Sequence, residues 1–153
     1  CRVMIGSVAT VILTVASFAA EVQPAAPTDL GRYAAKYPFG AVDGLRFLDH
    51  PVVIAAVRQA APSPLISDLI LTQGRASQVA VDGDMILSWA CEPDNCEHQW
   101  VILLGRRSGT QLICHRRVLS DEGIWYRGGQ PVATGRGCPD RIASVPAAVK
   151  ALF

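Results

Sequence analysis

The sequence predicts an α+β domain in which a central antiparallel sheet of about five strands is flanked by short helices. Helical periodicity is confined to short segments before residue 72 and at the C-terminal end, while strand-like segments fill the region between them. The links between these strands are too short for parallel crossovers, which favours antiparallel pairing. Half of the residues are hydrophobic and 18% are charged, as is typical of one globular domain.

The first 20 residues differ in character from this domain. Arg2 is followed by an uncharged stretch from Val3 to Ala20, whose end, Ser17-Phe18-Ala19-Ala20, carries small residues where export signals are cleaved. We therefore predict a signal peptide over 1–20, shortened at its start because the chain opens with Cys1. The alternative is a membrane anchor, since about 18 apolar residues can just cross a bilayer.

Residues 21–31 are rich in Ala and Pro without hydrophobic periodicity, which predicts a tether. The domain itself is then expected over 32–153. A cleaved leader would make the protein periplasmic or secreted.

A short helix is predicted over 52–60, because Asp49-His50-Pro51 combines capping residues with a proline at the first helical position. Val53, Ala56, Val57 and Ala60 share one face of this helix. The segment 65–71 is predicted to be helical or extended.

Strands are predicted over 77–81 and 84–90 around the turn Asp82-Gly83, and over 99–104 and 110–119 around a turn at 105–109. A fifth strand is centred on 124–126. Ser144 and Pro146 are expected to begin a C-terminal helix that carries Val149, Leu152 and Phe153.

Removal of the leader leaves four cysteines, Cys91, Cys96, Cys114 and Cys138. An even number in an exported protein predicts disulfides, and four cysteines allow three pairings. Proximity in the sequence favours Cys91–Cys96 with Cys114–Cys138.

The segment from Cys91 to Cys96 is the most informative part of the chain. A disulfide there would close a small ring that contains Pro93, whose backbone angle is preset, and the polar residues Glu92, Asp94 and Asn95. Such a ring predicts a preorganised, outward-pointing loop that binds a partner. The alternative is a structural staple between two strands.

This segment, Cys91-Glu92-Pro93-Asp94-Asn95-Cys96, resembles the loop of the Ivy family of inhibitors of vertebrate c-type lysozyme. Family members carry a disulfide-closed Cys-Lys-Pro-His-Asp-Cys loop between two strands. The turn Gly83-Asp84 and the hydrophobic strand after the loop are also similar, and the resemblance covers roughly 48–119. It implies an antiparallel sheet with short helices, often a homodimer, that inserts loop 91–96 into the active-site cleft of the enzyme.

The chain departs from the family at two positions of the loop. Asp94 replaces the His that meets the two catalytic carboxyl groups of lysozyme, and Glu92 replaces the Lys. Like charges in a poorly solvated cleft repel unless a proton is shared, although the Asn95 amide can also donate. A second hypothesis is therefore an envelope interaction protein of the same fold that binds another partner, for example a lytic transglycosylase.

Other function classes receive little support. His98 and His115 lie near cysteines, but the C-x4-C spacing and the expected disulfides disfavour zinc, so we predict no metal and no cofactor. The chain has no nucleophile-elbow motif, so we predict that it is not an enzyme. Without Arg2, 13 basic residues balance 13 acidic ones, which disfavours nucleic acid, and membrane contact is expected only through an uncleaved leader.

Overall fold

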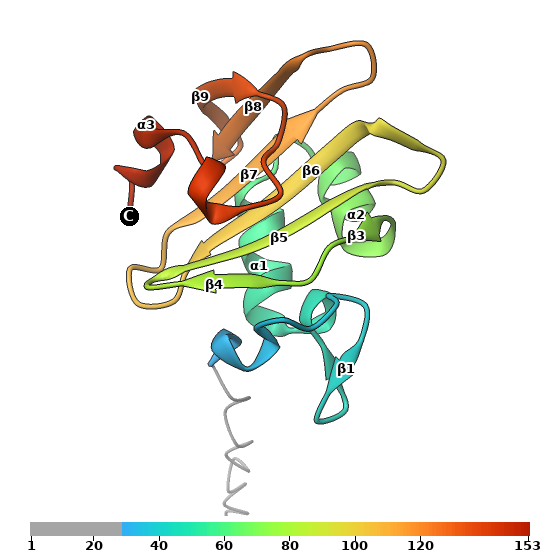
Figure 1. Ribbon diagram of the computed structural model, residues 1–153, viewed down its shortest axis with the longest axis vertical. Coiled ribbons are helices and arrows are strands. Elements are labelled where there is room, and N and C mark those ends of the chain that lie inside the picture. Colours follow the sequence, from blue (N-terminus) through green and yellow to red (C-terminus); the bar gives the residue numbers. More distant parts are fainter. Residues whose placement is uncertain (1–28) are drawn as a thin grey trace, which may run out of the picture.

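The computed structural model describes residues 29–153, so the predicted signal peptide and most of the predicted tether lie outside the described residues. Strands of one large antiparallel sheet run across the centre of the molecule (Figure 1). Within 29–153, no helix has the length and apolar character needed to cross a membrane.

The large sheet has seven strands, and all of its pairings are antiparallel. The order is β3-β5-β6-β7-β8-β9. The short strand β4 pairs with a different part of β5, on the same edge of that strand as β3. The strands are β3 (Arg75–Ala76), β4 (Ala80–Asp82), β5 (Met85–Glu92), β6 (Asn95–Gly105), β7 (Gln111–Arg116), β8 (Glu122–Arg127) and β9 (Gln130–Arg136). A separate hairpin consists of β1 (Ala41–Val42) and β2 (Leu45–Arg46). The predicted α+β class is confirmed, with more strands than expected.

Both faces of the sheet are covered, which explains the unbroken apolar run in β6 (Figure 1). Trp100, Ile102 and Leu104 belong to the core shared with α1 (Pro51–Ala60) and α2 (Pro64–Thr72). Val101 and Leu103 point to the other face, where the C-terminal segment packs. That segment contains the 3-10 helix η3 (Ile142–Ser144) and α3 (Ala147–Lys150).

The helix α1 begins as its sequence predicts. The His50 side chain accepts a hydrogen bond from the Val52 N–H at 3.3 Å, and Pro51 occupies the first turn. The predicted face, Val53, Ala56, Val57 and Ala60, is the buried face. The segment predicted as helical or extended is helical: α2 begins after Ser63, whose hydroxyl accepts from the Ile66 N–H.

Two further 3-10 helices lie before α1. The first, η1 (Leu30–Tyr33), spans the predicted boundary between tether and domain, and its Leu30 is buried. The second, η2 (Phe47–Asp49), leads directly into α1. Tyr33 and Phe47 are fully buried and meet edge to face, with ring centroids 5.5 Å apart.

Several strand boundaries differ from the predictions. The turn between β4 and β5 is Gly83-Asp84, one residue later than predicted. The reason is that this tight turn requires a positive φ at the first of its two central positions, and Gly83 supplies it at φ +56°. The strands predicted over 77–81 and 110–119 are β4 and β7, both shorter. The fifth predicted strand is β8.

The strands β3 and β9 and the hairpin β1–β2 were not predicted. The sequence of β9, QPVATGR, contains Pro and Gly and is largely exposed, so it lacks the alternation of a half-buried strand. It forms because β8 provides a pairing partner. Its proline is tolerated because β9 lies at the edge of the sheet, where one side of the strand has no ladder to interrupt.

Candidate functional site

The two longest strands, β5 and β6, form a hairpin whose tip is the predicted binding loop. The strands are eight and eleven residues long, and only Pro93 and Asp94 lie between them. The tip extends past the ends of the neighbouring strands on the side of α2 (Figure 1). The loop is therefore a projection of the sheet and not a surface depression.

The disulfide Cys91–Cys96 closes the tip, as predicted, with the two Cα atoms 4.8 Å apart. Cys91 is fully buried and Cys96 is exposed, so the ring is fixed to the core through one of its ends. Pro93 and Asp94 are exposed. Glu92 and Asn95, which were expected to point outward with them, are only half-exposed because both contact the bulge described next.

A bulge in β6 shapes the base of the ring. Cys91 pairs with Gln99 and Glu92 pairs with Asn95, so Cys96, Glu97 and His98 have no partner in the ladder with β5. The Glu97 N–H donates to Asn95 Oδ1 at 3.2 Å, and Gln99 Nε2 donates to the Cys96 carbonyl at 2.7 Å. Bulges redirect side chains and occur often beside functional sites.

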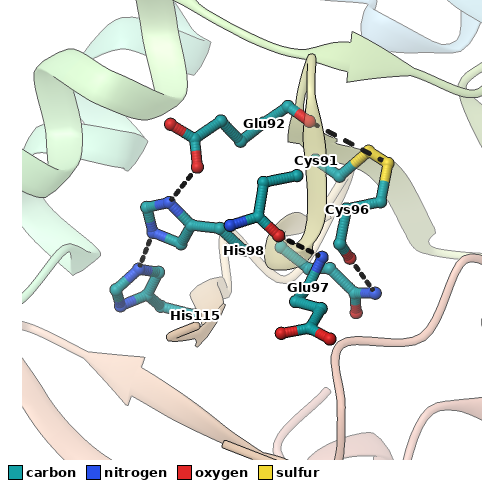
Figure 2. A network of polar contacts seen from close by, with 8 residues as sticks. Cys91, Glu92, Cys96, Glu97, His98 and His115 are labelled. Atoms are coloured by element: carbon teal, nitrogen blue, oxygen red, sulfur yellow. Dashed lines mark hydrogen bonds and ion pairs between the residues drawn. A yellow bond between two sulfur atoms is a disulfide. The ribbon is translucent and has the colours of Figure 1, made fainter. Parts of the chain in front are cut away.

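The bulge turns His98 toward a polar chain that runs from the ring into the sheet (Figure 2). His98 Nδ1 lies 3.4 Å from Glu92 Oε2, and His98 Nε2 lies 2.9 Å from Nε2 of His115 in β7. The His98 ring also meets Trp100 edge to face, with centroids 5.5 Å apart. Glu92 of the ring is thereby linked through His98 to a buried residue two strands away.

The hydrogen bond between His98 and His115 requires that one Nε2 atom carries a hydrogen and that the other does not. Burial, and to a smaller extent the electrostatic influence of His98 and Arg117, lower the pKa of His115 to about 4. His115 is therefore neutral near pH 7. The unprotonated Nε2 of His115 can accept from His98, or its N–H tautomer can donate to His98.

The two histidines do not form a metal centre with the residues around them. Their Nε2 atoms lie at hydrogen-bond distance from each other, and Glu92 faces the opposite nitrogen of His98. Across 29–153, no group of three or more His, Cys, Asp or Glu side chains has an arrangement that could hold a metal ion. Zinc usually takes at least three protein ligands.

Sequence reasoning treated His98 and His115 separately and missed their contact. Strand periodicity could have indicated that His98 and Trp100, two residues apart, lie on the same face of the sheet. The structure adds that His115 pairs with Trp100 on the neighbouring strand. The register and the bulge, which decide the distance, could not be derived from the sequence.

The second disulfide, Cys114–Cys138, was also predicted and has a different setting. Both cysteines are buried, their Cα atoms are 5.7 Å apart, and the bond joins β7 to the C-terminal segment. Trp89 Nε1 donates to the Cys138 carbonyl at 3.1 Å. Trp100 and Trp125 are fully buried.

Comparisons with protein-family models, with curated proteins and with solved structures found no match to this chain. The shape and chemistry of the hairpin tip are therefore the basis on which its role is inferred.

Proposed function

We propose that this protein is an exported inhibitor of c-type lysozyme that inserts the ring Cys91–Cys96 into the active-site cleft of the enzyme. The observation that carries the proposal is the exposed Pro93-Asp94 tip, closed by a disulfide and anchored through the buried Cys91. A loop that is already ordered loses little conformational entropy on binding, which favours insertion into a concave site.

The tip carries groups suited to a pair of carboxyl groups in different protonation states. In lysozymes one catalytic carboxylic acid is held protonated by a raised pKa, while the other stays ionised. The Asp94 carboxylate can accept a hydrogen bond from the O–H of the protonated acid. The Asn95 side chain, whose oxygen is already engaged by the Glu97 N–H, presents its amide hydrogens to the ionised partner.

This pairing makes inhibition depend on pH. Once the catalytic acid of the enzyme loses its proton, Asp94 faces a second negative charge in a poorly solvated cleft. We therefore expect inhibition to weaken as the pH rises above the pKa of that acid.

The proposed location follows from the two disulfides, which persist in the periplasm or outside the cell and are rare in the cytosol. An inhibitor in either place would meet a lysozyme directed at the cell wall.

One observation favours a second candidate, an envelope protein that presents the same tip to another partner such as a lytic transglycosylase. Asp94 and Glu92 make the ring acidic where the resemblance implies His and Lys. A partner with basic or amide groups in its cleft would fit this tip better than a carboxyl pair does.

The full chain should be titrated against a c-type lysozyme on cell-wall substrate, together with Asp94→His. Wild type is expected to slow lysis at micromolar concentration, and Asp94→His to inhibit more strongly because imidazolium can pair with the enzyme's carboxylates. Asp82→His is the matched control, since Asp82 is an exposed aspartate beside the turn between β4 and β5, at the opposite end of β5 from the ring.

The outcomes separate the two candidates. Inhibition gained only by Asp94→His would support the second candidate, because the scaffold would be intact and the native tip adapted to another partner. If neither protein slows lysis at micromolar excess, lysozyme inhibition is contradicted.

A further inference from the structure

The loop between β7 and β8, residues 117–121, lies at the same end of the sheet as the ring. The ladder shows this directly: Cys91 pairs with Gln99, and Gln99 pairs with Arg116, the last residue of β7. Both connections leave the sheet at that end and project on the same side of the molecule (Figure 1).

Leu119, in this loop, combines two unfavourable properties. Its side chain is 92% exposed, the highest value among the large hydrophobic residues exposed in the described chain, and its backbone has φ +63°. A leucine rarely adopts the left-handed region, because its Cβ crowds the following carbonyl. Its neighbour Val118 is also exposed, at 41%.

The loop is held in this shape by hydrogen bonds on both sides of Leu119. Arg116 Nε donates to the Ser120 carbonyl, the Ser120 N–H donates to the Arg117 carbonyl at 3.2 Å, and the Glu122 N–H donates to Ser120 Oγ at 3.2 Å. The fold thus fixes an apolar side chain in solvent in a disfavoured conformation, and the side chain gains no packing in return. Strain of this kind concentrates at functional sites.

The ring and this loop are connected through Gln99. Gln99 donates to the Cys96 carbonyl of the ring and pairs in the ladder with Arg116, the residue that precedes the loop. At the other end of the loop, the Asp121 carbonyl accepts a hydrogen bond from the Gly137 N–H at 2.9 Å. The loop is therefore tied to the same part of the sheet as the base of the ring.

We infer that Leu119, with Val118, is a second contact for the partner that receives the ring, and that it occupies an apolar, aromatic-lined recess beside the polar centre of the cleft. The inference rests on the proposed function. Clefts that bind a polymer extend beyond their reacting groups and are lined mainly by hydrophobic and aromatic side chains, with a few polar groups. In a lysozyme, this recess is a neighbouring sugar subsite.

The test compares Leu119→Asn and Leu119→Met with wild type, using the full chain. Asn tolerates the left-handed backbone, so Leu119→Asn should keep or raise the midpoint of thermal unfolding while it removes the apolar contact. We expect its Kd for a c-type lysozyme, measured by calorimetry, to rise about tenfold or more, as burial of one leucine side chain implies. Leu119→Met should bind within about threefold of wild type, because methionine keeps an apolar side chain of similar volume.

Leu65→Asn is the matched control, because Leu65 is a second highly exposed leucine, at 76%, in the first turn of α2. Its Kd should not change. If wild type binds lysozyme and Leu119→Asn binds equally well, the inference is overturned and the proposed function stands. If Leu119→Asn instead abolishes self-association in sedimentation while the lysozyme Kd is unchanged, the loop is a contact between copies and the inference is overturned too.

Absence of lysozyme binding by wild type would be a different result. It would remove the proposed function, and the inference about its second contact with it.

Discussion

The two disulfides of this domain are the same covalent bond in opposite surroundings. Cys114–Cys138 is buried at both ends and joins β7 to the C-terminal segment that covers one face of the sheet. Cys91–Cys96 has one buried and one exposed cysteine and joins only the two sides of a hairpin tip.

The difference shows how one type of cross-link can stabilise a fold or shape a site. A cross-link restricts the unfolded chain more when it closes a longer loop. The chain-entropy relation gives about 3.5 kcal/mol for the larger ring and about 2 kcal/mol for the smaller one. The first bond is therefore expected to dominate stability, and the second to fix the conformation of the four residues between Cys91 and Cys96, of which Pro93 and Asp94 are exposed.

The largest expected effect is the loss of the buried bond. Cys114→Ala with Cys138→Ala should lower the free energy of unfolding in urea by about 3.5 kcal/mol or more, since burial of the packed sulfurs is lost as well. The C-terminal segment, which Trp89 also holds through the Cys138 carbonyl, should become more accessible to protease. If this double variant loses less free energy of unfolding than the variant that lacks the Cys91–Cys96 disulfide, the buried bond does not dominate stability.

The next effect concerns His115, which follows Cys114 and reaches the base of the ring through His98. In the unfolded chain its pKa is near 6.5, and in the folded domain it is about 4, so the unfolded state takes up a proton that the folded state resists. The contribution of neutral His115 to the free energy of unfolding should be fully present above pH 6.5. It should be lost as the pH drops toward 4, and the loss should be at most about 3 kcal/mol.

Urea titrations of wild type and His115→Gln at several pH values isolate this contribution, because Gln does not titrate. Wild type should lose more stability than the variant between pH 6.5 and 4. Parallel pH profiles for the two proteins would show that the contact between His98 and His115 carries no linked proton.

The smallest effect on stability is expected at the ring. Cys91→Ala with Cys96→Ala should lower the free energy of unfolding by about 2 kcal/mol, yet weaken binding to the partner by tenfold or more, because the tip must then be ordered during association. Cys114→Ala with Cys138→Ala, measured at a temperature where it remains folded, is the control that should keep its binding. Equal losses of binding in both variants would mean that the ring acts only through global stability.

Local patterns predicted the parts of the fold that depend on neighbouring residues. The capping residue and proline at His50-Pro51, the buried face of α1 and the pairing of the nearest cysteines all follow from contacts within a few positions or from short loops. The hairpin tip belongs to this group, since its ring requires only two cysteines at the ends of adjacent strands.

Other features were missed because their cause lies across the sheet. The edge strand β9 has no alternation of its own and exists because β8 offers it a partner. Gly123 in β8 is a related case: a Cβ there would collide with the Gly137 carbonyl and crowd Cys114 Sγ, a constraint that appears only once the C-terminal segment is in place.

The sequence by itself determined the antiparallel α+β class and a polar, proline-containing segment between two cysteines, and it favoured, among three possible pairings, the two disulfides that form. Tertiary structure alone decided that His98 meets His115 beneath that ring and that Leu119 stands at the same end of the sheet. The physical reason is register: a shift of one residue between strands would turn a strand residue such as His115 to the opposite face, and register is fixed by the packing of both faces together.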